Sequence, residues 1–270
     1  MKNNFIIILS ITFLCIAINT NGQKLPNKQE TSVWAPADIK INGKASEWDT
    51  QFKAYNKATE VFYTLANDDQ NLYLIIRAEI PGVINKIIRG GLSFIISPAG
   101  KSKSNSKDNI CLTYPHITDL QELHLYMNNL GEYQQDTTRY KKAIDSFVFV
   151  NNKELTIRAK TIKISGIKSI SDSLISIYNE YGILTTAFFD HTTALFYKLS
   201  LPLRYLKKLL ATNDMFRYHI LLNAIDEKNV VQTTWKPNGE FFIHIEPGYK
   251  NLLAPTDFWG DYILAQTNNR

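Results

Sequence analysis

Two neighbouring apolar runs, joined by a polar turn, constrain the fold of this chain more than any other feature. They span residues 61–66 and 72–79. In the second run, apolar side chains recur on one face because side chains alternate along a strand with period two. The first run is apolar on both faces and rich in β-branched and aromatic residues, as expected of an inner strand. The turn 67–71 holds Asn and Asp, which tolerate left-handed backbone, so the stretch predicts a β-hairpin whose second strand buries one face.

The rest of the chain repeats this pattern of short β-type runs and polar turns. It predicts further strands at 39–41, 92–97, 154–165, 183–189, 193–199, 215–225 and 239–245. Three brief helices are predicted at 81–90, 117–130 and 202–210. Many short strands and few helices indicate a mostly-β fold, an antiparallel β-sandwich. No period of repeat length is visible, which argues against a solenoid or a propeller.

The N-terminal 22 residues are typical of a secretory signal peptide, with Lys2, an apolar run at 5–18 and a small residue, Gly22, before the cleavage point. The run is shorter than the ~20 residues of a membrane span. A lipoprotein anchored at Cys15 is the alternative. We expect a flexible leader at 23–32, one domain at 33–270 with no transmembrane segment, and a secreted or periplasmic, outer-membrane-associated protein.

The composition of the chain limits the cellular compartments and the binding partners that we expect. After removal of the predicted signal peptide, Cys111 is the only cysteine, so no intramolecular disulfide forms, which suits a bacterial envelope or secreted protein stabilised by its core. The 30 Lys and Arg exceed the 25 Asp and Glu by little and are spread along the chain, so nucleic acid is not an expected partner. The lysine- and serine-rich stretch 100–108 predicts a solvated loop, with a basic patch for an acidic partner as the alternative.

Three motifs, in order, resemble those of a known family. They are IKING at 39–43 with EWD at 47–49, NDDQNLYL at 67–74, and YKLSLPL at 197–203. This order resembles the family 9 carbohydrate-binding-module-like domains, which belong to the DOMON-like β-sandwiches. It is also similar to secreted proteins of Bacteroidetes-type bacteria in which this domain stands alone. The resemblance implies a jelly-roll-like sandwich and, in sugar-binding members, sugar rings stacked on aromatic side chains beside structural calcium.

Candidate sugar-binding residues follow from the chemistry of sugar rings, whose apolar C–H faces stack on aromatic side chains while polar groups bind the hydroxyls. The candidates are Trp235, which precedes a turn, and Trp259 beside Tyr249 and Asp257. The family's paired-tryptophan clamp does not align with any two tryptophans of this chain. The alternative is that Trp259 and Trp48 are core residues and that Trp235 supports a loop.

Calcium is the one cofactor that the sequence raises. Asn67, Asp68 and Asp69 offer the hard oxygen ligands that calcium prefers, although three adjacent turn residues supply only part of a coordination shell. An ordinary Asx turn is the alternative.

Catalytic motifs are missing from the sequence. There is no G-x-S-x-G, H-E-x-x-H or C-x-x-C. A glycosidase-type carboxylate pair stays open as an alternative, drawn from Asp190, Glu240 and Glu246. A haem site inside the sandwich is a further alternative, with ligands from Met215, His219 and His244.

The sequence therefore predicts a secreted, non-catalytic β-sandwich protein that binds carbohydrate through exposed aromatic side chains. The second hypothesis is an interaction or assembly protein of the bacterial envelope, without sugar binding. A glycoside hydrolase is the third.

Overall fold

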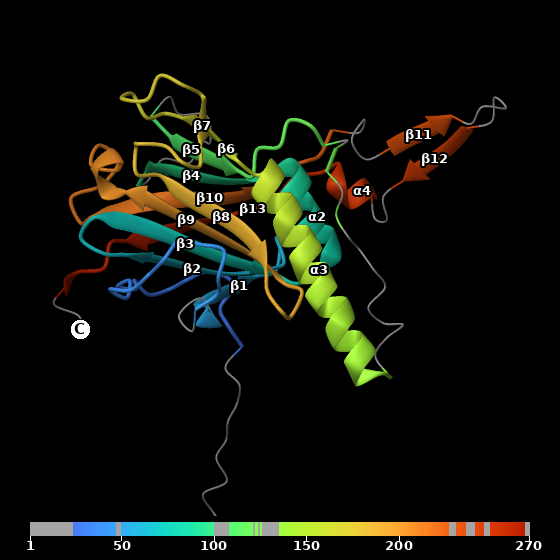
Figure 1. The fold of residues 1–270 in the computed structure, drawn as a ribbon. Helices are drawn as coiled ribbons and strands as arrows, with labels where there is room; N and C mark the ends of the chain where they lie inside the picture. Colours follow the sequence, from blue (N-terminus) through green and yellow to red (C-terminus); the bar gives the residue numbers. More distant parts are fainter. Residues whose placement is uncertain are drawn as a thin grey trace, which may run out of the picture.

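The computed structural model describes residues 24–46, 50–99, 108–120, 122–123, 125, 135–226, 231–235, 241–245 and 249–267, with backbone alone at 231–235, 241–245 and 249. Two antiparallel sheets form a sandwich, which confirms the predicted fold class (Figure 1). The first sheet has the order β1 (Ala54–Asn56), β2 (Val61–Asn67), β3 (Asn71–Ala78), β9 (Leu195–Pro202) and β8 (Leu184–Phe189). The second has the order β13 (Thr256–Ile263), β10 (Met215–Leu222), β4 (Leu92–Pro98), β5 (Ile110–Tyr114), β6 (Thr161–Ser165) and β7 (Leu174–Ser176).

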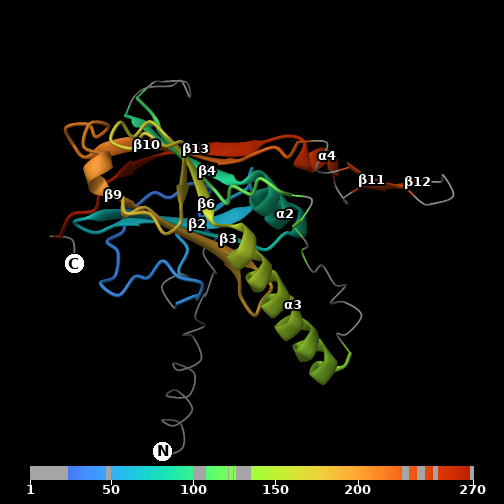
Figure 2. The ribbon, with the colours of Figure 1, turned by 45° about the horizontal axis from the view of Figure 1, so that its top comes forward.

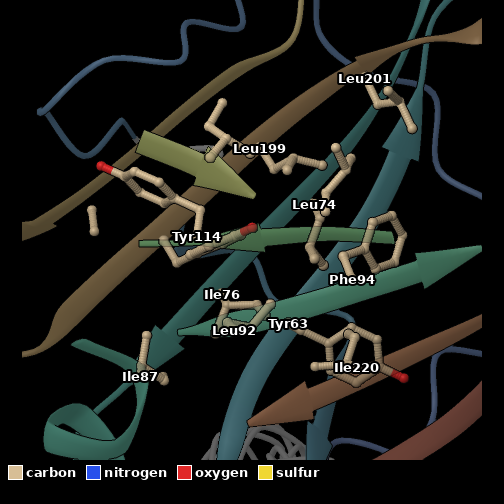
Figure 3. Close-up of a cluster of buried hydrophobic side chains, with 14 of the residues drawn as sticks. Tyr63, Leu74, Ile76, Ile87, Leu92, Phe94, Tyr114, Leu199, Leu201 and Ile220 are labelled. Atoms are coloured by element: carbon tan, nitrogen blue, oxygen red, sulfur yellow. The ribbon is translucent and has the colours of Figure 1, made fainter. Parts of the chain in front are cut away.

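The core fills the space between the two sheets. Tyr63 and Leu74 of the first sheet are completely buried, as are Phe94 and Ile220 of the second, and Figure 3 shows these side chains in one cluster. Burial of such side chains contributes roughly 1.5 to 3 kcal/mol each. The hydroxyl of Tyr63 satisfies its polar end by a 2.8 Å hydrogen bond to the hydroxyl of Tyr218. The apolar layer therefore joins the sheets without leaving these two hydroxyls unpaired.

The hairpin of β2 and β3 is confirmed, as is the burial of both faces of β2. The prediction that β3 buries only one face is wrong, because Tyr73 and Ile75 on its other face are 6% and 1% exposed. Side chains from the segment before β1, including Leu25 and Ile41, pack over this outer face. The first sheet is thus covered on both sides.

Part of the expected leader, residues 23–32, is held against β2. Gln29 is buried, and its side-chain amide donates to the Leu65 carbonyl while its side-chain oxygen accepts from the Leu65 N–H, both at 2.8 Å. Through these two bonds, the Gln29 side chain takes the place that a neighbouring strand would have beside Leu65 of β2. Gln29 is thus anchored to β2, and the flexibility of the leader as a whole stays a prediction.

The helix predicted at 81–90 is confirmed as α2 (Pro81–Gly90). Pro81 occupies its first turn, where a missing N–H costs nothing, and Gly91 follows it at φ +78°, a region that favours glycine. The apolar side of α2, with Ile87 in the core cluster of Figure 3, closes one end of the sandwich.

The strand predicted at 154–165 is wrong in its first half. Residues up to Arg158 belong to α3 (Thr137–Arg158), and only β6 is a strand. Asp136 caps this helix by accepting the N–H groups of Thr138 and Arg139. The alternation seen at 154–158 also fits helical spacing, because Asn151 and Leu155, four residues apart, are buried together on one face.

Several other predicted strands and helices differ from the structure in type or in position. Residues 39–41 form no strand. Residues 117–120 form no helix, and most of the rest of the helix predicted at 117–130 lies outside the described residues. In place of the helix predicted at 202–210, the structure has the 3₁₀ turn η3 (Leu203–Tyr205). The strand predicted at 239–245 is β12 (Phe241–Ile245), which pairs with β11 (Val231–Trp235) in a separate hairpin, followed by the short helix α4 (Tyr249–Leu252). The predicted signal peptide, Trp48 and the lysine-rich stretch 100–107 lie outside the described residues. Within the described part of the chain, no helix has the length and apolarity to span a membrane.

Candidate functional site

The outer face of the second sheet carries the candidate site. Along β10 and β13, every second side chain points away from the core, because strand side chains alternate. The pairing of these two strands places His219 opposite Trp259 and Arg217 opposite Asp261. Figure 2 shows β10 and β13 along one side of the sandwich, and α2 and α3 at one of its ends. In contrast to the first sheet, polar side chains collect on this outer face.

Trp259 is half-buried and stacks on His219. Their ring centroids are 3.9 Å apart and their planes differ by 9°. Among the described residues, no second ring contacts Trp259, and no strand pairs with the far side of β13, which is the edge of its sheet. One face of the indole is therefore occupied by His219, while the indole remains partly open to solvent.

His219 is fixed by Asp257, which lies on the same face of β13 as Trp259. The His219 Nε2 atom lies 2.7 Å from Asp257 Oδ2, and the histidine is only 6% exposed. A carboxylate accepts hydrogen bonds, so the Nε2–H tautomer donates to it. The Nδ1 atom is buried and has no hydrogen-bond partner among the described residues. Burial lowers the pKa of His219, and the Asp257 carboxylate opposes this only in part, so the ring is neutral at neutral pH.

Arg217 and Asp261 form a second polar pair on the same face. The guanidinium Nε lies 3.1 Å from the Asp261 carboxylate, and both side chains are partly exposed. Such an exposed pair contributes less than about 1 kcal/mol to stability. The pair matters for the site because it keeps one donor group, the guanidinium, and one acceptor group, the carboxylate, near the Trp259 ring. We call these five residues the Trp259 site: Arg217, His219, Asp257, Trp259 and Asp261.

The structure brings two of the four predicted sugar-binding residues together, Trp259 and Asp257, and it places Trp259 outside the main core. Trp235 belongs to β11 of the separate hairpin and Tyr249 begins α4, and the side chains of both lie outside the described structure. The clustering of Trp259 with Tyr249 therefore stays a prediction.

The residues predicted for calcium are engaged in hydrogen bonds. Asn67 is buried, and its side-chain oxygen accepts from the Ala265 N–H and the Tyr262 hydroxyl. One Asp68 oxygen accepts the N–H groups of Gln70 and Asn71 at 2.7 Å, which is the geometry of an Asx turn. Asp69 is exposed. Within the described ranges, no three His, Cys, Asp or Glu residues cluster as metal ligands. The contacts fit the Asx turn, and calcium binding stays a prediction.

The described residues do not bring together the side chains proposed for a glycosidase or for a haem site. Asp190 accepts the N–H groups of Thr192 and Ala194 within the β8–β9 turn, and Glu240 and Glu246 lie outside the described structure. His219 lies on the outer face of the second sheet, so it cannot bind a haem inside the sandwich; the side chain of His244 is not described.

Three members of the site are not predicted for this role. The sequence raises His219 only as a haem ligand and does not point to Arg217 or Asp261. Arg217 and His219 come close to β13 through strand pairing across about forty residues of sequence, which local patterns do not encode. The one usable signal was the period of two, which puts Arg217 and His219 on the same face of β10.

The buried histidine predicts a pH dependence of stability. Because its folded-state pKa lies below the ordinary value of 6.5, the unfolded chain binds more protons just below that pH. Stability should therefore be fully present above about pH 6.5 and decline as the pH falls. We expect urea unfolding to show a smaller loss between about pH 7.5 and about pH 5 for His219→Gln than for the native protein.

His191→Gln, which changes an exposed histidine, is the control and should keep the native loss. His116, whose pKa is also lowered by burial and by Lys163, adds a contribution of the same sign in all three proteins. An equal loss in His219→Gln and the native protein would contradict the assignment.

No family model matches the chain, and no curated protein matches it. Among solved structures, the chain is similar to a carbohydrate binding module of family 9 from Caldicellulosiruptor kristjanssonii, determined in complex with glucose. The identity is 9%, the TM-score is 0.37, and the match covers 87% of this chain and 95% of the other.

Proposed function

We propose that this chain is a secreted, non-catalytic protein that binds glycans at the Trp259 site. The observation that carries the proposal is a partly exposed indole on an open sheet face, held by a parallel histidine ring 3.9 Å away and flanked by the Asp257 and Asp261 carboxylates. The apolar face of a sugar ring matches an indole, and sugar hydroxyls donate to carboxylates.

The site favours a neutral sugar. Its two carboxylates are about half exposed and can accept hydroxyl hydrogen bonds, and Arg217 provides a donor near one of them. A rigid ring whose partner is already in place loses little conformational freedom on binding, which favours affinity. An acidic sugar would meet Asp257 and Asp261 at close range and is disfavoured there.

A protein partner is the second candidate function, and α3 is the observation that favours it. Phe149, Val150 and Ile157 on this helix are 69%, 39% and 48% exposed, whereas large apolar side chains of a helix are usually turned to the core. An envelope protein that docks on α3 would make the chain an assembly component, with or without sugar binding.

A glycan-array screen tests the proposed function. The protein is applied with calcium and, separately, with a chelator, and we expect retention on at least one neutral polysaccharide or oligosaccharide. Retention that survives the chelator would show that binding needs no calcium, in keeping with the hydrogen-bonded state of Asp68. A folded protein that binds no neutral glycan under either condition would overturn the proposal and favour the protein partner.

A further inference from the structure

A separate cavity lies at the end of the sandwich opposite α2. It adjoins Pro98, the last residue of β4, whereas α2 directly precedes the first residue of that strand. The cavity has a volume of about 600 Å³ and lies between the β4 and β5 ends, the turn after β6 and the segment that follows β9. This size is within the range of about 300 to 1,000 Å³ that ligand pockets occupy.

The walls of the cavity are strongly basic. Lys168, Arg204, Lys207 and Lys208 line it, and Asp108 is the one acidic residue among its lining residues. Four cations facing one space repel each other, and an anion placed between them relieves that repulsion. The lysines are exposed, so salt should weaken this attraction.

The floor of the cavity is apolar. Ile110, Ile167 and Leu209 line it and are each less than 10% exposed. A ligand that combines an anionic group with a body that has an apolar face would therefore match both parts of the cavity.

Arg204 is held in place before any ligand arrives. Its Nη2 donates to the Tyr181 carbonyl and, at 3.1 Å, to the Tyr205 hydroxyl. The guanidinium also lies 4.7 Å from the centre of the Tyr205 ring, a cation–π contact. A guanidinium fixed in this way loses little freedom when it binds a carboxylate or a sulfate, and its planar donor set suits both groups.

We propose that this cavity binds a sugar-sized ligand carrying one carboxylate or sulfate group, such as an acidic or a sulfated monosaccharide unit. The acid group contacts Arg204 and the lysines, and the ring covers the apolar floor. None of the residues that line the cavity belongs to β10 or β13, so this site is distinct from the Trp259 site and does not depend on it.

Calorimetric titration with four probes tests the proposal: D-glucuronate, D-glucose 6-sulfate, D-glucose and inorganic sulfate. We expect the two anionic sugars to bind and, in Trp259→Ala, which lacks the neutral-sugar site, glucose and inorganic sulfate to bind at least about tenfold more weakly than the anionic sugars. The double variant K207E/K208E should weaken the anionic sugars by about tenfold or more, which corresponds to about 1.4 kcal/mol. The matched control is K141E/K142E, the same charge change on exposed residues of α3, which should leave binding unchanged.

Each other outcome counts against the site. Failure of the native protein to bind either anionic sugar would overturn it, as would equal weakening by K141E/K142E, which would indicate an effect of net charge alone. Equal affinity for inorganic sulfate would refute a role for the apolar floor. Repeating the titrations in Trp259→Ala keeps the two proposals apart, because binding at this cavity should survive that substitution while glycan binding at the Trp259 site should not.

Discussion

Gly260→Ala is expected to destabilise the fold by about 3 kcal/mol or more, the largest effect that we predict for a single methyl group. A Cβ atom at this position would lie 2.2 Å from both Cζ and Oη of Tyr218, the residue directly opposite on β10. The Tyr218 ring is completely buried and its hydroxyl is bonded to Tyr63, so it cannot move aside without breaking that bond and disturbing the core. The second sheet should separate or shift at its β13 edge.

Urea unfolding followed by circular dichroism measures this effect. Gly82→Ala is the matched control, because an added Cβ there meets nothing within 4 Å and the residue lies in α2, where alanine is the better helix former. We expect the control to change stability by no more than about 1 kcal/mol, in the stabilising direction. Equal stability of the two variants would contradict the packing of Tyr218 beneath Gly260.

Trp259→Ala, one residue away, is expected to give the opposite result: a stable fold that no longer binds glycan. The indole is half-buried on the outer face, so its removal costs the stack on His219, about 1 kcal/mol, together with the area that the indole buries there, and leaves the core between the sheets intact. Loss of the stacking surface should weaken glycan binding by about 2 kcal/mol or more, which is roughly thirtyfold. Affinity electrophoresis in a gel that contains the glycan found by the array screen measures the loss.

Phe149→Ala is the control for removal of an aromatic ring, since Phe149 is 69% exposed on α3 and away from β13. It should migrate as the native protein does in the glycan gel. If Phe149→Ala lost binding and Trp259→Ala kept it, the glycan site would have to be moved from the second sheet to α3.

The parts of the fold that the sequence predicted are those set by local chemistry. The β2–β3 hairpin follows from alternation and from an Asx-rich turn, and α2 follows from Pro81 at its start and Gly91 at its end. The sequence predicts no part of the α3 helix, and it assigns residues 154–158, the end of α3, to a strand because they satisfy both strand and helix periodicity. Tertiary contacts decided the outcome, since Asn152 bonds to the backbone of Phe189 on β8.

The site was predictable only in part. Asp257 and Trp259 are two residues apart, so the period of a strand is enough to place them on one face. The stack of His219 on Trp259 depends on which strands pair and in which register, and a single sequence does not specify that. In the same way, the cover over Tyr73 and Ile75 comes from a segment about thirty to fifty residues earlier, which local alternation cannot reveal.

The most direct test of the central proposal is an NMR titration that follows the tryptophan indole N–H signals while the glycan found by the array screen is added. The chain has four tryptophans, so the readout is four signals, and Trp259→Phe assigns the one that matters. We predict that the Trp259 signal shifts in proportion to occupancy while the Trp34 signal stays in place. A saturable titration that leaves the Trp259 signal unchanged and moves another indole instead would contradict glycan binding at the Trp259 site.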